Sequence, residues 1–91
     1  MTDDMKLTIE KFNGTNFAYW KMQIEDLLYQ KNFYLPLGGK AKKPTTMSDA
    51  EWEVFDRKAL GTVRLSLSKS VTFNISKEKT TKDVMDALSR M

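Results

Sequence analysis

Two groups of charged residues in this chain are dense enough to do chemistry, and the first of them is acidic. Glu51, Glu53 and Asp56 follow one another within a single helical pattern. Paired carboxylates catalyse acid–base reactions when burial raises the pKa of one member. Helix capping, the helix dipole and an i, i+4 ion pair from Glu53 to Arg57 account for these acidic residues more simply. We therefore assign no catalytic residue to this group.

The second group is basic and lies in the most loop-like segment of the chain. Lys40, Lys42 and Lys43 form the densest basic cluster, and Phe33 and Tyr34 precede them closely. Lysine-rich loops contact phosphates, and aromatic side chains stack on the bases of single-stranded nucleic acids. A solvated loop accounts for the same lysines without any ligand. Lys40, Lys42 and Lys43 are therefore candidate contacts to RNA or to a protein partner.

Several other kinds of site are excluded by residue types that the chain lacks. It contains no histidine and no cysteine. This excludes disulfides, zinc sites built from these residues, a histidine general base and a nucleophile activated by histidine. Gly38-Gly39 lacks the Lys-Ser/Thr pair and the helix start of a phosphate-binding loop. We expect no enzyme activity, no metal site and no cofactor.

Length and charge indicate one small soluble domain. The chain has 91 residues, of which 41% are hydrophobic and 30% are charged. Its formal net charge of +3 is only weak evidence for nucleic-acid binding, because the basic and acidic residues are mostly interspersed. No apolar run approaches the roughly 20 residues that cross a membrane, and no signal peptide is visible. We expect a single cytoplasmic domain over residues 1–91, without membrane contact.

The most specific local pattern is KFNGTNFAYW at residues 11–20, which predicts a sharp turn followed by a helix. Asn13-Gly14 favours the turn because both residues tolerate positive φ. Asn16 is a good N-cap for a helix from Phe17 to about Gln30. The apolar residues on one face of this helix are Phe17, Trp20, Ile24, Leu27 and Leu28.

A second helix has the clearest start in the sequence. Ser48-Asp49-Ala50-Glu51 is a capping box, and the helix that it begins extends to about Leu67. Its apolar residues at steps of three or four are Trp52, Phe55, Ala59, Val63 and Leu67. Gly61 weakens the middle of the helix by up to about 1 kcal/mol relative to alanine. A glycine there also leaves room for another helix to approach closely.

Two shorter helical segments follow. Val71 and Ile75 point inward from a helical turn over residues 71–75, and Thr80 or Thr81 caps a last helix. This last helix carries Val84, Met85, Leu88 and Met91. Because the pattern stops at the end of the sequence without a C-cap, we expect the chain to be cut within the C-terminal helix of a longer protein.

These segments predict an all-α fold of about four helices in a small bundle. A flexible tail over residues 1–6 and a short extended arm, with Leu7 and Ile9 on one side, precede the first helix. We expect the apolar stripes to form one core from Phe17, Trp20, Ile24, Leu27, Trp52, Phe55, Val63, Leu67 and Leu88.

Three blocks of residues resemble the N-terminal part of the Gag polyprotein of copia-type LTR retrotransposons, especially plant ones. The first block is Lys11-Phe12-Asn13-Gly14-Thr15-Asn16-Phe17, followed by Trp20 and by Leu27-Leu28. The second block is Trp52, Asp56, Ala59, Val63 and Leu67. The third block is residues 80–88. The order and spacing of the blocks fit over nearly the whole chain. One departure is Met85, near which the family commonly has a tryptophan.

The resemblance implies a structural role as the N-terminal, all-helical lobe of a capsid. Such a lobe contributes to the self-assembly of virus-like particles that package the RNA of the retrotransposon. Its implied partners are further copies of itself, held by weak and repeated contacts, and the downstream capsid lobe of the same polyprotein. In this family RNA is bound mainly elsewhere in Gag, so contact of this region with RNA is indirect.

Two alternatives belong to other functional classes. One is a protein-interaction adaptor domesticated from such an element, which keeps the fold but forms no shell. The other is an RNA-binding module that uses the loop of Lys40 to Lys43. High-order assembly distinguishes the capsid lobe from the adaptor, and salt-sensitive RNA binding identifies the RNA-binding module.

Overall fold

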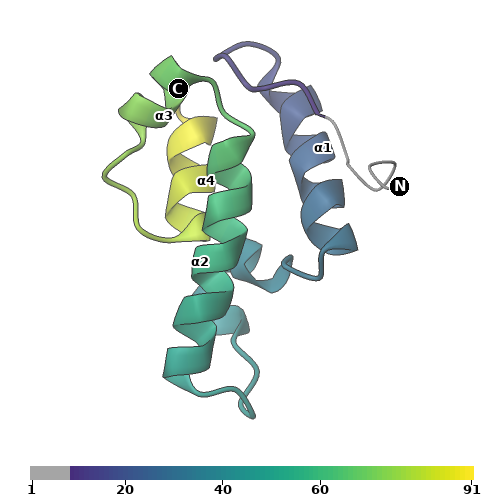
Figure 1. The fold of residues 1–91 in the computed structure, drawn as a ribbon, viewed down its shortest axis with the longest axis vertical. Coiled ribbons are helices and arrows are strands. Elements are labelled where there is room, and N and C mark those ends of the chain that lie inside the picture. Colours follow the sequence, from purple (N-terminus) through teal and green to yellow (C-terminus); the bar gives the residue numbers. More distant parts are fainter. Residues whose placement is uncertain (1–8) are drawn as a thin grey trace.

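The computed structural model describes residues 9–91, which form four α-helices and two short 3₁₀ helices (Figure 1). The α-helices are α1 (Phe17–Gln30), α2 (Asp49–Leu65), α3 (Lys69–Asn74) and α4 (Thr81–Ser89), and the 3₁₀ helices η2 (Leu35–Gly38) and η3 (Lys40–Lys42) lie between α1 and α2. The described residues contain no strand, so the predicted all-α class is confirmed. The predicted tail over residues 1–6 and Leu7 of the arm lie outside the described residues.

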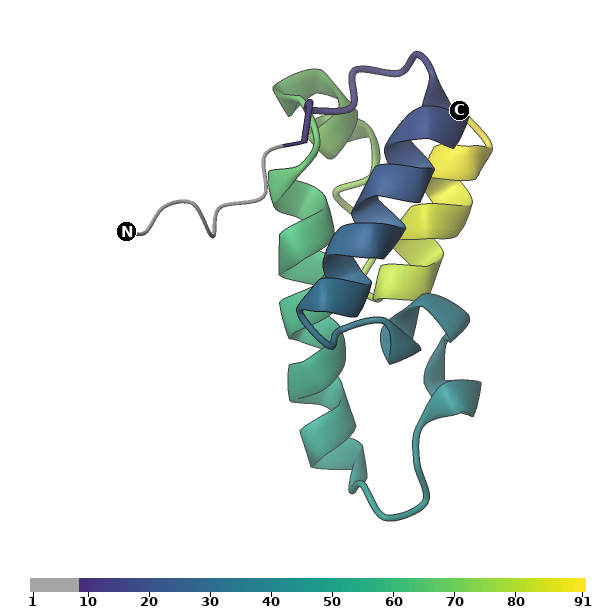
Figure 2. The same ribbon diagram turned by 90° about the vertical axis from the view of Figure 1, so that its right-hand side faces the viewer.

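The longest helix, α2, organises the arrangement. The helices α1 and α4 lie beside its C-terminal half, and α3 lies at the same end (Figures 1 and 2). The 3₁₀ helix η2 packs against both α4 and α2 and closes the opposite end of the bundle. The N-terminal half of α2 extends past α1 and α4 and faces the segment that carries η3 (Figure 2).

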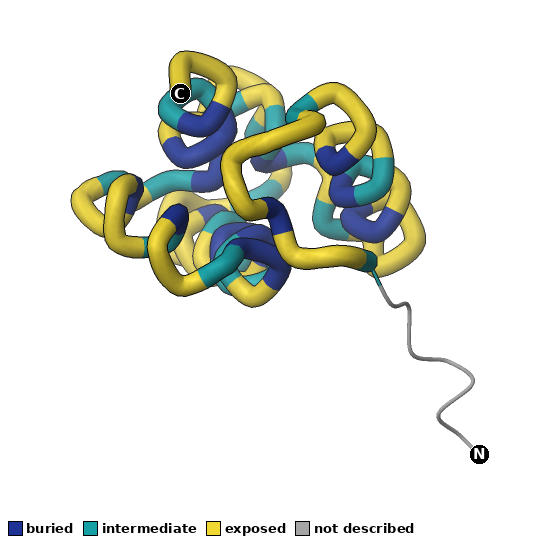
Figure 3. The backbone as a smooth tube through the Cα atoms, turned by 90° about the horizontal axis from the view of Figure 1, so that it is seen from above, coloured by how far each residue is buried: buried dark blue, intermediate teal, exposed yellow. Residues whose placement is uncertain are grey.

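The core lies where these helices face one another, as the distribution of buried positions shows (Figure 3). Its buried residues are Phe12, Trp20, Ile24, Leu27, Leu28, Ala59, Leu60, Val63, Leu67, Val71, Ile75, Val84, Met85 and Leu88. Phe17 is partly buried against this cluster. Six of the nine residues expected in the core are therefore members of the cluster, and Phe17 borders it.

Trp52 and Phe55 form a smaller aromatic contact beside the main cluster. Trp52 is 4% exposed and meets the ring of Phe55 edge-on, with 5.7 Å between the ring centroids. Phe55 in turn meets Phe33 edge-on at 6.1 Å, and Phe33 packs against the main cluster. The expected single core thus has an aromatic extension, because α2 continues past the helices that cover its other half.

Local hydrogen bonds explain where the later helices begin. The Ser48 Oγ accepts from the backbone N–H of Glu51 at 3.1 Å, and the Glu51 carboxylate accepts from the backbone N–H of Ser48 at 2.9 Å. The predicted capping box at the start of α2 is therefore confirmed. Thr80, one of the two predicted candidates, caps α4 by accepting from the N–H of Asp83. Ser68 caps α3 in the same way through the N–H of Val71.

Asn16 is the N-cap residue of α1 and the helix begins and ends at the predicted residues, but the expected capping by the Asn16 side chain is wrong. Asn16 has a left-handed conformation, with φ of 60°, and its side chain makes no capping hydrogen bond. A capping side chain needs an extended backbone to reach the free N–H groups of the first turn. The tight turn before α1 prevents this conformation: Gly14 has φ of 103°, and the Asn13 Oδ1 accepts from the N–H and the hydroxyl of Thr15.

Two predicted helix ends also differ. The helix α2 ends at Leu65 rather than Leu67, because Leu67 forms a parallel β-bridge with Phe12. The bridge consists of the Phe12 N–H donating to the Ser66 carbonyl at 2.8 Å and the Ser68 N–H donating to the Phe12 carbonyl at 2.9 Å. The helix α4 ends at Ser89, so Met91 lies beyond it and is exposed.

Removing the capping hydroxyl should measurably weaken α2. We expect Ser48→Ala to lower the free energy of unfolding by about 1 kcal/mol, because the N–H of Glu51 loses its acceptor. Urea unfolding followed by far-UV circular dichroism measures this as a lower midpoint at an unchanged slope. Ser48→Asp, which keeps an acceptor, should restore most of the loss. An equal loss from Ser70→Ala, at an exposed residue, would show that the effect does not arise from capping.

Candidate interaction surfaces

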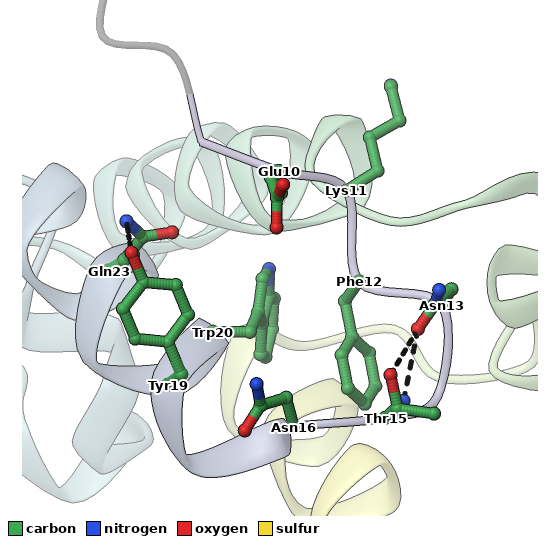
Figure 4. A pocket seen from close by; sticks show the side chains of 9 residues that line it. All are labelled: Glu10, Lys11, Phe12, Asn13, Thr15, Asn16, Tyr19, Trp20 and Gln23. Carbon is green, nitrogen blue, oxygen red and sulfur yellow. Dashed lines mark hydrogen bonds between the residues drawn. The ribbon is translucent and has the colours of Figure 1, made fainter.

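The most specific sequence pattern forms an aromatic contact between the N-terminal segment and the end of α2 (Figure 4). The Phe12 ring stacks on Trp20 with 5.0 Å between centroids, and Phe17 lies 5.7 Å from Phe12 and 5.8 Å from Trp20. The Trp20 Nε1 donates to the Ser66 Oγ at 3.2 Å, and this hydroxyl donates to the Val63 carbonyl at 2.6 Å. These contacts give the pattern a structural role, since Phe12 and Trp20 are buried.

A small pocket lies beside this contact. Its volume is about 110 Å³, and Figure 4 shows the side chains that line it, from Glu10 on the N-terminal segment to Gln23 on α1. Small-molecule sites usually measure roughly 300–1,000 Å³. The pocket is therefore smaller than a usual small-molecule site.

The three lysine side chains of the basic loop do not meet at one site. The Lys43 Nζ donates to the Met47 carbonyl at 2.6 Å and lies 3.7 Å from the Asp49 carboxylate. The Lys40 Nζ lies 3.6 Å from the same carboxylate oxygen, whereas Lys42 lines a pocket together with residues of α1 and η2. Because Asp49 offsets part of the positive charge of two of the three lysines, this loop is a weaker phosphate site than its sequence indicates.

The loop is also held in place by α4. Gly39 has φ of 84°, and a Cβ added to it would lie 2.7 Å from the Cδ of Lys82. The Lys82 ammonium donates to the Asp86 carboxylate at 2.8 Å. This hydrogen bond, and then the charge of Asp86, raise the pKa of Lys82 above its usual value. The basic loop therefore lies against the Lys82 side chain of α4, and a side chain at residue 39 would be strained by the positive φ and would displace Lys82.

Sequence reasoning did not predict a pocket of about 380 Å³ around two tyrosines. The rings of Tyr29 and Tyr34 stack in parallel, with 4.2 Å between centroids and 9° between planes. Leu35, Leu37 and Lys42 complete the wall with Glu25 and Gly38. The two tyrosines lie on either side of the end of α1, so helical periodicity gives no signal that they meet. The pocket offers an open aromatic face beside one cation.

The three acidic residues of α2 have separate roles. Glu51 belongs to the capping box, and Glu53 is exposed. The Asp56 carboxylate accepts from the backbone N–H of Thr81 at 3.1 Å, and the Asp56 carbonyl accepts from the Thr81 hydroxyl at 3.0 Å. Asp56 therefore joins α2 to the start of α4. Among residues 9–91, no three His, Cys, Asp or Glu side chains gather where they could hold a metal ion.

Several large apolar side chains are exposed on the outer faces of the helices. They are Tyr19, Met22 and Tyr29 on α1, Tyr34 before η2, Val54 and Leu65 on α2, Phe73 on α3, and Met91. Within the described part of the chain, none of the helices has both the length and the apolar composition needed to cross a membrane. Scattered exposed apolar residues are normal, whereas a row along one helix marks a contact surface.

The sequence is similar to a large polyprotein. Over 88 residues, which are 96% of this chain, it is 35% identical to the Retrovirus-related Pol polyprotein from transposon TNT 1-94 of Nicotiana tabacum. The chain spans 7% of the length of that polyprotein and corresponds to its N-terminal region. No protein-family model matches the chain, and no solved structure matches it.

Proposed function

We propose that this chain, which is similar over 96% of its length to the N-terminal region of a plant retrotransposon polyprotein, is a Gag-like structural domain that assembles particles with further copies of itself. The similarity over 96% of the chain is the observation that carries the proposal. The particles package the RNA of the element, and the domain itself performs no catalysis. It acts in the cytoplasm together with the downstream capsid lobe of the same polyprotein.

The placement of the residues that resemble Gag supports this proposal. Phe12, Trp20 and Asp56 are used inside the fold, in the aromatic contact and in the junction of α2 with α4. Contacts with other molecules are therefore expected on the outer faces of the helices. Symmetric assembly repeats each contact many times, so individually weak surfaces are sufficient to hold a closed shell.

RNA binding by the basic loop is less well supported than assembly. Lys40 and Lys43 both lie within 4 Å of the Asp49 carboxylate, which competes with phosphate for their charge. We therefore propose that the domain contributes to packaging through assembly, and that contact with RNA is indirect.

Sedimentation velocity over a wide range of concentrations tests the proposal. We expect the sedimentation coefficient to rise reversibly with concentration, from the monomer toward dimers and larger species. A strict monomer at the highest soluble concentration would overturn self-assembly by this chain and favour an adaptor domesticated from such an element. Tight RNA binding that disappears on changing Lys40, Lys42 and Lys43 to glutamine would instead favour an RNA-binding module.

A further inference from the structure

The pocket around Tyr29 and Tyr34 is large enough to hold a small ligand. Its volume of about 380 Å³ falls within the usual range of roughly 300–1,000 Å³ for small-molecule sites. Both tyrosines stay exposed, at 59% and 36%, and neither belongs to the core cluster. The packing of the bundle therefore does not account for this pair of rings.

The two tyrosine rings favour a flat, conjugated ligand. They stack in parallel, with 4.2 Å between centroids and 9° between planes. A third planar ring can continue such a stack, and nucleobases stack on aromatic side chains in this way. The aromatic part of the pocket therefore suits a base.

The cation of the pocket is Lys42, and Gly38 makes room for its side chain. A Cβ added to Gly38 would lie 2.5 Å from the Lys42 Cγ, so the stem of the lysine lies directly against the glycine. Gly38 has no positive φ, so its missing side chain matters for space and not for backbone conformation. Within residues 9–91 the Lys42 ammonium forms no ion pair, whereas Lys40 and Lys43 both lie close to Asp49. Lys42 therefore offers an unpaired charge to a phosphate.

The pocket also contains one carboxylate, that of Glu25. Glu25 precedes Tyr29 by one helical turn, so the two side chains project from the same face of α1. A carboxylate has about four acceptor positions, and the Lys21 ammonium occupies one of them, at 2.9 Å from Oε2. Glu25 can therefore accept hydrogen bonds from the edge of a base stacked on Tyr29. Guanine carries two adjacent N–H groups on its Watson–Crick edge, and a carboxylate can accept both.

We propose that this pocket binds the guanine base of a nucleotide. The base stacks on the tyrosine pair, the Glu25 carboxylate accepts from its two N–H groups, and the Lys42 ammonium contacts the phosphate. A free guanine mononucleotide and a guanosine within single-stranded RNA present the same groups, so either is a source of this ligand. The site does not depend on self-assembly of the chain.

The sequence indicates lysines beside aromatic residues as nucleic-acid contacts, and the fold changes which residues meet. Phe33 packs against the core, and Tyr29 takes its place beside Tyr34. Lys42 lines the pocket with these two rings, whereas Asp49 lies beside the other two lysines of the basic loop. The proposed site is therefore separate from the part of the loop that Asp49 neutralises.

Titration of the isotope-labelled chain with mononucleotides, followed by NMR, tests the proposal. We expect guanosine monophosphate to shift the amide signals of Tyr29, Tyr34 and Lys42. Adenosine monophosphate presents an acceptor in place of the ring N–H and should bind more weakly, on the order of tenfold. Inosine monophosphate lacks only the amino group of guanine and should fall between the two. Equal binding of the guanine and adenine nucleotides would overturn the assignment to guanine.

The phosphate contact is tested by comparing a nucleotide with its nucleoside. Lys42→Gln should weaken binding of guanosine monophosphate several-fold and leave binding of guanosine, which has no phosphate, unchanged. Lys40→Gln removes the neighbouring lysine of η3, which lies beside Asp49, and is the matched control. It should change neither affinity. Equal losses from the two substitutions would show that only the general positive charge of the loop attracts the nucleotide.

Two further substitutions test the contacts to the base. Glu25→Gln should abolish the preference for guanosine monophosphate over inosine monophosphate, because an amide cannot accept from both N–H groups. Tyr29→Leu should weaken binding of every nucleotide on the order of tenfold, because the base loses its stacking partner. Tyr19→Leu changes an exposed tyrosine of α1 outside this pocket and should have no effect. Far-UV circular dichroism verifies that each variant is folded.

Two RNA molecules identify the source of the base. One is a short uridine-rich single strand with a central guanosine, and the other has uridine throughout. Tighter binding of the first RNA than of guanosine monophosphate would assign the site to RNA and make the contact of this domain with RNA direct. Equal or weaker binding would assign it to a free nucleotide. If guanosine monophosphate shifts no signal of the pocket, the proposed site is wrong, whereas self-assembly, measured by sedimentation, is unaffected.

Discussion

Trp20→Ala should destabilise the chain more than any other substitution considered. We expect it to lower the free energy of unfolding by about 3–5 kcal/mol, the usual loss when a buried aromatic residue is truncated. The substitution removes the stack on Phe12 and the contact with Phe17, and it leaves the Ser66 hydroxyl without the indole N–H that it accepts. Domains of this size are stable by only about 5–15 kcal/mol, so the loss is a large share of the stability and, at the low end of that range, all of it.

Two variants separate packing from hydrogen bonding in this result. Trp20→Phe keeps an aromatic ring against Phe12 but loses the indole donor, and we expect it to cost less than Trp20→Ala. Tyr19→Ala changes the exposed neighbour on the same helix and should shift stability by less than about 0.5 kcal/mol. Urea unfolding followed by far-UV circular dichroism measures all three. A Trp20→Ala variant that unfolds at the same urea concentration as the unsubstituted chain would contradict the structural role of the pattern.

Asp56→Ala should produce the second largest loss, about 1–3 kcal/mol. The substitution removes the acceptor of the Thr81 backbone N–H, at a residue that is completely buried. This N–H belongs to the first turn of α4 and has no partner within its own helix. Water cannot easily replace the lost carboxylate, so the cost is that of a buried donor without an acceptor.

Asp56→Asn is the informative companion because its side-chain oxygen can still accept from Thr81. We expect it to retain most of the stability that Asp56→Ala loses. Amide hydrogen exchange gives a local measurement, since the N–H of Thr81 should lose protection in Asp56→Ala and keep it in Asp56→Asn. The exposed residue Glu53, changed to alanine, is the control on the same helix. Equal stability of Asp56→Ala and Glu53→Ala would refute the proposed junction between α2 and α4.

The helices could be predicted from the sequence because their signals are local. The 3.6-residue spacing from Phe17 onward places both ends of α1 correctly, and the capping box at Ser48 fixes the start of α2. The turn over residues 71–75 was also predicted as helical, and α3 contains most of it. Each of these elements depends on residues within about two turns of one another.

Several features that could not be predicted join residues distant in the sequence. The bridge from Phe12 to Leu67 and the hydrogen bonds from Thr81 to Asp56 have no counterpart in a periodic pattern. Asn16 has the right residue type for a cap, but the neighbouring turn fixes its backbone in another conformation. The basic cluster is also a weaker phosphate site than its sequence indicates, because Asp49 lies close to two of its lysines in the folded chain.

The contact between Trp20 and Ser66 also limits how early the domain can fold during translation. The two residues are separated by 46 positions, so the ribosome releases Phe12, Phe17 and Trp20 well before their partners. At about 5–20 residues per second, synthesis of the intervening segment takes roughly 2–9 seconds. During this interval the three aromatic side chains can contact one another but lack the end of α2, against which they pack in the folded domain. We expect them to be accessible to chaperones during this time, because a nascent chain that stops before Ser66 lacks the surface that buries them.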